Sequence, residues 1–217
     1  YVKKNEKQLF YQMIGKAVNF VVIAGLPLSV YFMIFADESI LFLAGEGYQG
    51  SVVPMILLMP TVLLIGLSNT TGIQVLTPQN MEQKVLNSIL WGAVIDFILN
   101  LALIPKFASS GAAFATLTAE LAVLIVQCVY LRESILGMAK AVSWRKVIPA
   151  ILLGSAAGAA VKLLADFSGI VQSVEIEAFL TLAVSGCAFF GGYGAALLAT
   201  KEEFVWGLVG SRFSPKQ

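Results

Sequence analysis

Long apolar stretches recur along the chain, each about as long as a membrane-spanning helix. The apolar residues do not alternate with polar ones, as they would in the strands of a membrane barrel. Because a helix needs about 20 residues to cross the hydrocarbon core, this pattern predicts six spanning helices. Their expected ranges are Leu9–Phe35, Val52–Leu76, Val85–Leu103, Ser110–Leu131, Val147–Leu164 and Ala178–Thr200.

The composition indicates that lipid surrounds these helices. Hydrophobic residues make up 58% of the chain and charged residues only 12%, and the mean hydropathy is +0.85. Soluble domains carry about 25% charged residues. The expected fold class is therefore all-α, a polytopic membrane helix bundle with six transmembrane helices.

Several kinds of chemistry are excluded by the residues present. The chain has no histidine, so histidine triads, histidine proton relays and histidine metal sites are absent from it. Cys128 and Cys187 form no closely spaced pair, and no glycine-rich loop carries the Lys-Ser or Lys-Thr of an ATP site. We expect no metal, no cofactor and no enzyme active site. A net charge of +1 gives no bulk attraction to nucleic acid.

The charges between the apolar stretches predict the topology. Basic residues gather before the first span, in the segment 132–146 and in the tail 201–217, whereas the segments 36–50 and 165–177 are mainly acidic. Cytoplasmic loops of membrane proteins carry the excess of Lys and Arg. Six helices with both chain ends in the cytoplasm satisfy this rule.

Two spans carry acidic residues, Asp96 and Glu120. A charge at the centre of the bilayer costs about 3 kcal/mol on insertion scales, so these acids are the leading functional candidates. Asp96 belongs to a stripe of small or polar residues that recur every fourth position and share one helix face. The stripe consists of Ser88, Gly92, Asp96 and Asn100, and Thr116 accompanies Glu120 on the next helix.

Two interpretations of these acids remain open. In the first, one or both carboxyls take up a proton or a cation and thereby bias a transporter between inward-facing and outward-facing states. In the second, a protonated carboxyl makes an interhelical hydrogen bond to Asn100 or Thr116, an interaction worth about 1 kcal/mol in membranes.

Two lysines near span ends, Lys16 and Lys162, are candidates for contact with an anionic headgroup, because an ammonium binds phosphate as a compact charge. The alternative is that both side chains extend to the membrane interface. Pro27 and Pro60 lie inside spans and are candidate hinges, or else fixed kinks. The polar run 66–72 must face protein or a wet cavity if its backbone is irregular.

Small residues at four-residue spacing predict close helix contacts. One such seam is expected where the helix at 110–131 meets its neighbour. Two more are expected to pack the last two helices together. The seams are Gly111, Ala115 and Ala119; Gly154 and Gly158; and Cys187, Gly191 and Ala195.

Three stretches carry a resemblance to a known family. They are Gly72-Ile73-Gln74-Val75-Leu76, Leu99-Asn100-Leu101-Ala102-Leu103-Ile104-Pro105-Lys106-Phe107, and Gly111-Ala112-Ala113-Phe114-Ala115-Thr116 with Ala119-Glu120. The chain resembles the C-terminal part of bacterial lipid-linked oligosaccharide flippases, the O-antigen or polysaccharide branch of the MOP exporter superfamily. The resemblance is best over Gly47 to Arg132. It departs at Ala108, where the family usually has Gly, and at Asp96, where an apolar residue or Asn is usual.

The resemblance implies a transporter with two six-helix lobes that open alternately to the two faces of the bacterial inner membrane. Its substrate would be a glycan on an undecaprenyl pyrophosphate carrier, and its partners would be membrane lipid and polysaccharide polymerase or assembly proteins. Residues 1–131 would form the last four helices of the second lobe, 132–146 a cytoplasmic connection, 147–200 an additional helix pair and 201–217 a cytoplasmic tail. Many cavity-lining helices would then precede Tyr1.

Other functions are compatible with the same helices. A cation-coupled drug or metabolite exporter of the same superfamily would share the fold. A membrane glycan polymerase or ligase would need a large outer loop with Arg or His, and the outer loops here are short. A non-transporting scaffold would show no substrate-dependent change of conformation.

Overall fold

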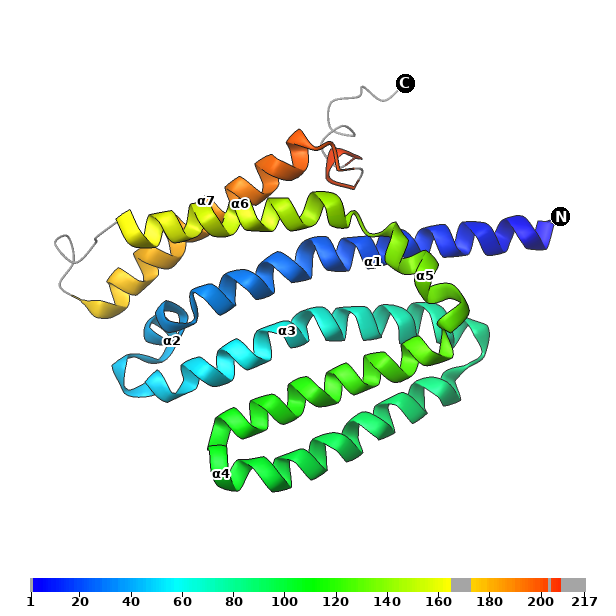
Figure 1. Ribbon diagram of the computed structural model, residues 1–217, viewed down its shortest axis with the longest axis horizontal. Helices are drawn as coiled ribbons and strands as arrows, with labels where there is room; N and C mark the ends of the chain where they lie inside the picture. Colours follow the sequence, from blue (N-terminus) through cyan, green and yellow to red (C-terminus); the bar gives the residue numbers. More distant parts are fainter. Residues whose placement is uncertain (1, 165–172, 203, 208–217) are drawn as a thin grey trace. The chain divides into compact units, whose positions relative to one another are not determined.

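The computed structural model describes residues 2–164, 173–202 and 204–207 (Figure 1). Within these ranges every regular element is helical and no strand occurs, which confirms the all-α prediction. The chain divides into two compact units, residues 1–36 with 48–142 and residues 37–47 with 143–217.

The first unit contains most of the expected spans. Its elements are α1 (Val2–Ile34), α3 (Val52–Asn69), the π-helix η2 (Thr70–Leu76), the 3-10 turn η3 (Thr77–Gln79), α4 (Glu82–Tyr130) and α5 (Arg132–Ala141). Helix α1 packs against α3 and α5, and α3 packs against α4. The segment 132–146 is expected to be a plain connection, but α5 occupies most of it.

Helix α4 contains two of the predicted spans and reverses direction between them. Its 49 residues are interrupted at Ala108, whose backbone angles are φ 48 and ψ −126, and the two arms run side by side (Figure 1). Gly111 permits this tight reversal, because a Cβ there would lie 2.6 Å from the carbonyl oxygen of Leu103. The predicted ranges Val85–Leu103 and Ser110–Leu131 fall on the two arms.

Ala108 is held in a conformation that favours glycine, which gives a testable expectation. Relief of a positive φ gains roughly 1–3 kcal/mol, and the greater freedom of glycine in the unfolded chain opposes this by about 0.5–1 kcal/mol. Ala108→Gly should therefore stabilise the protein by about 1 kcal/mol, measured by thermal unfolding in detergent. Ala102→Gly, at an exposed helical position near the end of the first arm, should instead destabilise it. Equal melting temperatures for the two variants would contradict the strain at Ala108.

The second unit is built on α6 (Trp144–Leu164) and α7 (Val174–Ala199), which pack against each other. Gly154 of α6 makes this packing close, since a Cβ there would lie 2.8 Å from the carbonyl oxygen of Phe189 and 3.2 Å from Cβ of Tyr193. Gly158 is buried as well. The expected contact with the last helix is confirmed for Gly154.

The other seam predicted for this pair is wrong. Cys187 and Gly191 are exposed, and nothing lies within 4 Å of a Cβ placed at Gly191. Helix α7 meets α6 through another face, on which Phe189 and Tyr193 are buried. The physical reason is that the backbone of α7 at Phe189 and Tyr193 approaches Gly154 directly, which turns the face with Cys187 and Gly191 outward.

The segment 36–50 is expected to be a loop, and this is also wrong. It forms α2 (Ala36–Ala44) and most of the 3-10 helix η1 (Glu46–Ser51). Asp37 and Glu38 occupy the first turn of α2, where negative charge interacts favourably with the helix dipole. Phe42 of α2 contacts Phe179 of α7, with ring centroids 5.2 Å apart.

A buried acid joins the ends of α6 and α7. Glu202 is fully buried; its Oε1 accepts a hydrogen bond from Ser143 Oγ at 3.2 Å, and its Oε2 accepts one from the Val205 amide at 3.0 Å. Lys146 Nζ donates to the Lys201 carbonyl at 2.9 Å. The rest of the predicted tail, 208–217 with Arg212 and Lys216, lies outside the described residues, as does Asp166.

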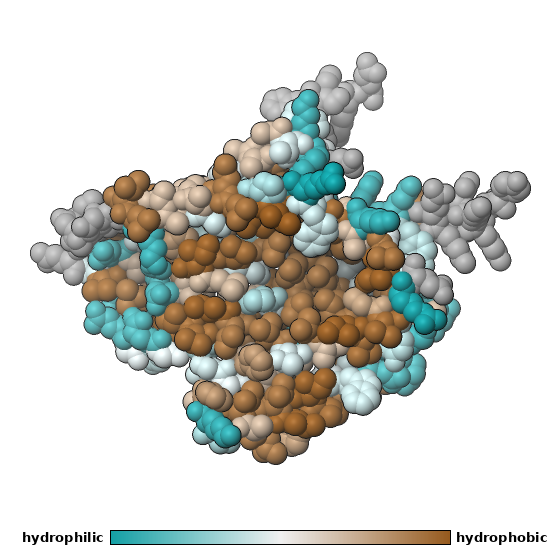
Figure 2. Space-filling view, viewed as in Figure 1, coloured by the Kyte–Doolittle hydropathy of each residue, from teal (hydrophilic) through white to brown (hydrophobic). Residues whose placement is uncertain are grey.

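Five helical stretches of the described chain are long and apolar enough to cross a membrane. One of them is the whole of α4, which doubles back, and the count of six crossings stays a prediction. Apolar side chains cover much of the face shown in Figure 2. Large ones on α4, such as Phe97 and Leu101, are 69% and 71% exposed, as expected for side chains that face lipid.

Candidate functional site

The hairpin of α4 sets the two acids opposite each other. Asp96 and Glu120 stand twelve residues before and twelve residues after Ala108. The same register places Ser88 near Gln127, and these two side chains share a hydrogen bond, Gln127 Nε2 to Ser88 Oγ at 3.1 Å. Between these two levels, a Cβ at Gly92 would lie within contact of Val123 and 3.3 Å from the Ala119 carbonyl.

A cavity of about 430 Å³ lies between α3 with η2 and the two arms of α4. Asp96 and Glu120 both line it. Its other polar lining comes from Ser68, Asn69, Thr116 and Gln127, and its apolar lining includes Ile65, Ile73, Val85, Ile89 and Val123. Two acids in a partly polar chamber can hold a proton or a small cation.

The stripe residues Asp96 and Asn100 have unmet hydrogen bonds. Asp96 Oδ1 and Asn100 Oδ1 are each shielded from solvent and have no hydrogen-bond partner. The expected interhelical bond from a protonated carboxyl to Asn100 is therefore not formed at Asn100 Oδ1. A buried acceptor without a partner costs about 1–3 kcal/mol, so the arrangement suits a group that binds something in another state. No group of three or more metal-ligating side chains is found among the described residues.

The polar run 66–72 has an irregular backbone and faces a cavity, as expected. The helix becomes a π-helix at Thr70, and Ser68, Asn69 and Gly72 line the cavity. π-Helical turns are rare and occur often at functional sites. The irregular backbone thus faces protein and a partly polar cavity, as a membrane interior requires.

A second polar feature contains the candidate Ser88, whose contacts with Gln127 and Thr71 were not predicted from the sequence. The Thr71 hydroxyl donates to Gln127 Oε1, Gln127 Nε2 donates to Ser88 Oγ, and Ser88 Oγ donates to the Val85 carbonyl at 2.6 Å. We call the three side chains Thr71, Gln127 and Ser88 the clasp. They are 4%, 2% and 0% exposed. A glutamine inside an apolar span was the available signal.

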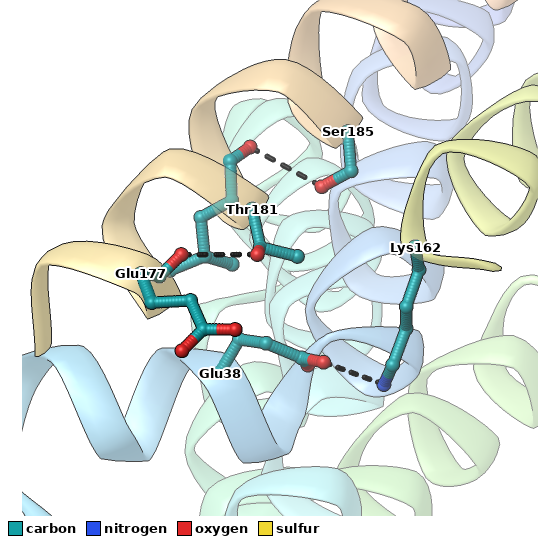
Figure 3. A network of polar contacts seen from close by, with 6 residues as sticks. Glu38, Lys162, Glu177, Thr181 and Ser185 are labelled. Carbon is teal, nitrogen blue, oxygen red and sulfur yellow. Dashed lines mark hydrogen bonds and ion pairs between the residues drawn. The ribbon is translucent and has the colours of Figure 1, made fainter. Parts of the chain in front are cut away.

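Neither of the two lysine candidates, Lys16 and Lys162, is among the residues that line the cavity. Lys16 is exposed on α1. Lys162 Nζ lies 2.6 Å from Glu38 Oε1, and Figure 3 shows the two side chains meeting, with Glu177 from α7 close by. In this structure the Lys162 ammonium has a carboxylate partner of its own.

The two proline candidates lie inside continuous helices, Pro27 in α1 and Pro60 in α3. The helices that carry them are joined by a hydrogen bond from Ser29 Oγ to the Met59 carbonyl, at 2.8 Å. This hydroxyl meets a backbone carbonyl directly before Pro60. The prolines therefore lie beside a contact between α1 and α3, and their use as hinges stays a prediction.

Comparisons with known proteins give a partial match. The chain is 25% identical over 122 residues to the Escherichia coli (strain K12) protein named "Putative O-antigen transporter". The match covers 56% of this chain and 29% of that protein, so the chain spans well under half of its length. No family model and no solved structure matches the chain. The chain is thus an all-α, multi-pass membrane protein with partial similarity to a transporter.

Proposed function

We propose that this chain is part of a flippase in the bacterial inner membrane. It moves oligosaccharide linked to undecaprenyl pyrophosphate across the membrane, by alternating access, for polysaccharide or O-antigen assembly. The partial similarity to an O-antigen transporter supports this function. The observation that carries it is the pair of acids in one cavity inside an apolar helix bundle.

In this proposal Asp96 and Glu120 couple transport to an ion gradient. When both are charged, they repel across the α4 hairpin and destabilise the closed arrangement of its arms. When a proton or a cation neutralises them, that arrangement gains stability. A ligand shifts a conformational equilibrium only as far as it binds one state better than the other, and the unmet oxygens of Asp96 and Asn100 supply such a difference.

The remaining sequence candidates have secondary roles. Lys16 contacts anionic headgroups or the carrier pyrophosphate at the cytoplasmic surface. Lys162 could contact a headgroup only if it released Glu38. Pro27 and Pro60 flank the region where α1 and α3 rearrange, both chain ends lie in the cytoplasm, and polymerase or other assembly proteins receive the product.

A leaflet assay tests the function. Deletion of the gene should strand lipid-linked repeat units on the cytoplasmic leaflet, because a polar glycan does not cross hydrocarbon unaided. The measurement is the fraction of lipid-linked glycan that a membrane-impermeant enzyme or lectin reaches from outside the inner membrane. Complementation should restore it. An unchanged outer fraction after deletion would contradict the flippase.

A further inference from the structure

The clasp lies at one end of the cavity. Ser88 and Gln127 stand twenty residues before and nineteen after Ala108, near the ends of the arms that lie away from the reversal. The acids stand about midway along the same arms. At 1.5 Å per residue, the clasp lies roughly 10 Å from the acids, towards the turn η3.

One amide joins three helical segments in the clasp. Gln127 Oε1 accepts from Thr71 in η2, and Gln127 Nε2 donates to Ser88 in the first arm, while Gln127 itself belongs to the second arm. Both ends of this amide are thus satisfied. Asp96 Oδ1 and Asn100 Oδ1, in the same hairpin, have no partner. The clasp is thus fully hydrogen-bonded through Gln127, whereas two oxygens nearer the reversal, on Asp96 and Asn100, have no partner.

The π-helix η2 packs closely against the Gln127 amide. A Cβ at Gly72 would lie 3.1 Å from Gln127 Nε2, so glycine lets η2 approach. Hydroxyls bond to the backbone carbonyls around the π turn: Thr70 Oγ1 lies 2.9 Å from the Gly66 oxygen, and Thr77 Oγ1 lies 3.1 Å from the Gly72 oxygen. Because these hydroxyls donate hydrogen bonds to the carbonyls, η2 can shift without leaving the carbonyls unpaired in the hydrocarbon region.

We propose that the clasp is a gate at this end of the cavity and that Gln127 is its positioning residue. With the clasp formed, η2 rests on both arms of α4, and Asp96 and Glu120 are shielded from the side of η3, which the predicted topology places towards the cytoplasm. When the clasp opens, η2 moves off the hairpin and the acids become accessible from that side. The role of this gate in transport rests on the proposed function, whereas the opening and closing of the clasp does not.

Thiol reactivity tests the gate without any transport assay. Cys128 and Cys187 are first replaced by alanine. Val75, four residues after Thr71 in η2 and fully buried, is then replaced by cysteine as the reporter. N-ethylmaleimide should modify it slowly in the full-length protein. Gln127→Leu should raise that rate about 10-fold, because a buried hydrogen-bonded contact that holds η2 is lost.

Matched variants separate the gate from a general loss of structure. Thr71→Val should act like Gln127→Leu, whereas Thr118→Val, whose hydroxyl bonds only within its own arm, should leave the rate unchanged. Gln127→Glu can still accept from Thr71 and, when protonated, donate to Ser88, so it should keep the rate low. A second reporter, Leu197→Cys, is buried in the other unit and should stay unreactive throughout.

Two results would overturn the gate. One is a Val75→Cys reporter that stays equally slow in Gln127→Leu and Thr71→Val. The other is a Leu197→Cys reporter that becomes reactive together with it, since Gln127 would then support the whole fold. Export should fall in Gln127→Leu and recover in Gln127→Glu. If the wild-type protein moves no lipid-linked glycan, the proposed function fails, and the thiol rates still decide the gate.

Discussion

Asp96→Asn and Glu120→Gln should each slow glycan export about 10-fold, the change that follows when about 1.4 kcal/mol of coupling between an ion and a conformational state is lost. Both substitutions keep the size of the side chain and remove its ability to take a charge. The two acids line one cavity. Each variant should therefore also respond less to the gradient that drives export.

The measurement is export by each variant at several imposed proton and sodium gradients, at matched protein levels. Glu46→Gln is the control, because Glu46 is an exposed acid in η1, outside the cavity. It should export like the wild type. Unchanged export by both cavity variants at every gradient would rule out a coupling role and leave the acids as helix contacts.

Gly154→Ala should destabilise the second unit by about 1–3 kcal/mol, the usual cost of overpacking. The added Cβ would lie 2.8 Å from the backbone oxygen of Phe189, and a backbone atom cannot move aside as a flexible side chain can. α6 and α7 would have to separate. Thermal unfolding in detergent, followed by a reporter attached to α7, measures the loss.

Gly191→Ala is the matched control and should change stability in the opposite direction. The substitution is again glycine to alanine, and Gly191 lies on α7, the helix that packs against α6. Nothing lies within 4 Å of the new Cβ. Alanine in a helix is favoured over glycine by up to about 1 kcal/mol, so this variant should be slightly more stable. A larger loss for Gly191→Ala than for Gly154→Ala would mean that the two helices pack through the other face.

This pair of glycines illustrates what sequence alone could not decide. α7 carries small residues on more than one face, and a four-residue spacing identifies each face equally well. The choice depends on where the large residues go. Phe189 and Tyr193 are buried against α6, which leaves Cys187 and Gly191 outside, and only the packed helix pair reveals this.

The acid site was more accessible to prediction. The stripe from Ser88 to Asn100 has helical spacing, so its shared face followed from periodicity. The periodicity could not predict which residue of the second arm lies opposite each stripe residue, because that pairing depends on where the chain reverses at Ala108. A one-residue change there would rotate the second arm by about 100° relative to the first and would separate Gln127 from Ser88. For this reason the cavity acids were predicted and the clasp was not.

The short helices around the spans were missed for a different reason. The segment 36–50 has an acidic, glycine-containing composition that is typical of a loop, and hydropathy finds only long spans. Its first nine residues nevertheless form α2, which Phe42 ties to α7. Such helices depend on tertiary contact more than on their own propensity.

The most direct test of the central claim is transfer of a lipid-linked oligosaccharide between leaflets by the purified protein that contains this chain. The protein is reconstituted into vesicles with a labelled undecaprenyl-pyrophosphate glycan, and an impermeant reagent follows the glycan that reaches the opposite leaflet. We expect transfer faster than in protein-free vesicles, and a clear slowing when Asp96→Asn and Glu120→Gln are combined. Transfer no faster than in protein-free vesicles, by a correctly folded protein under every gradient, would contradict the account.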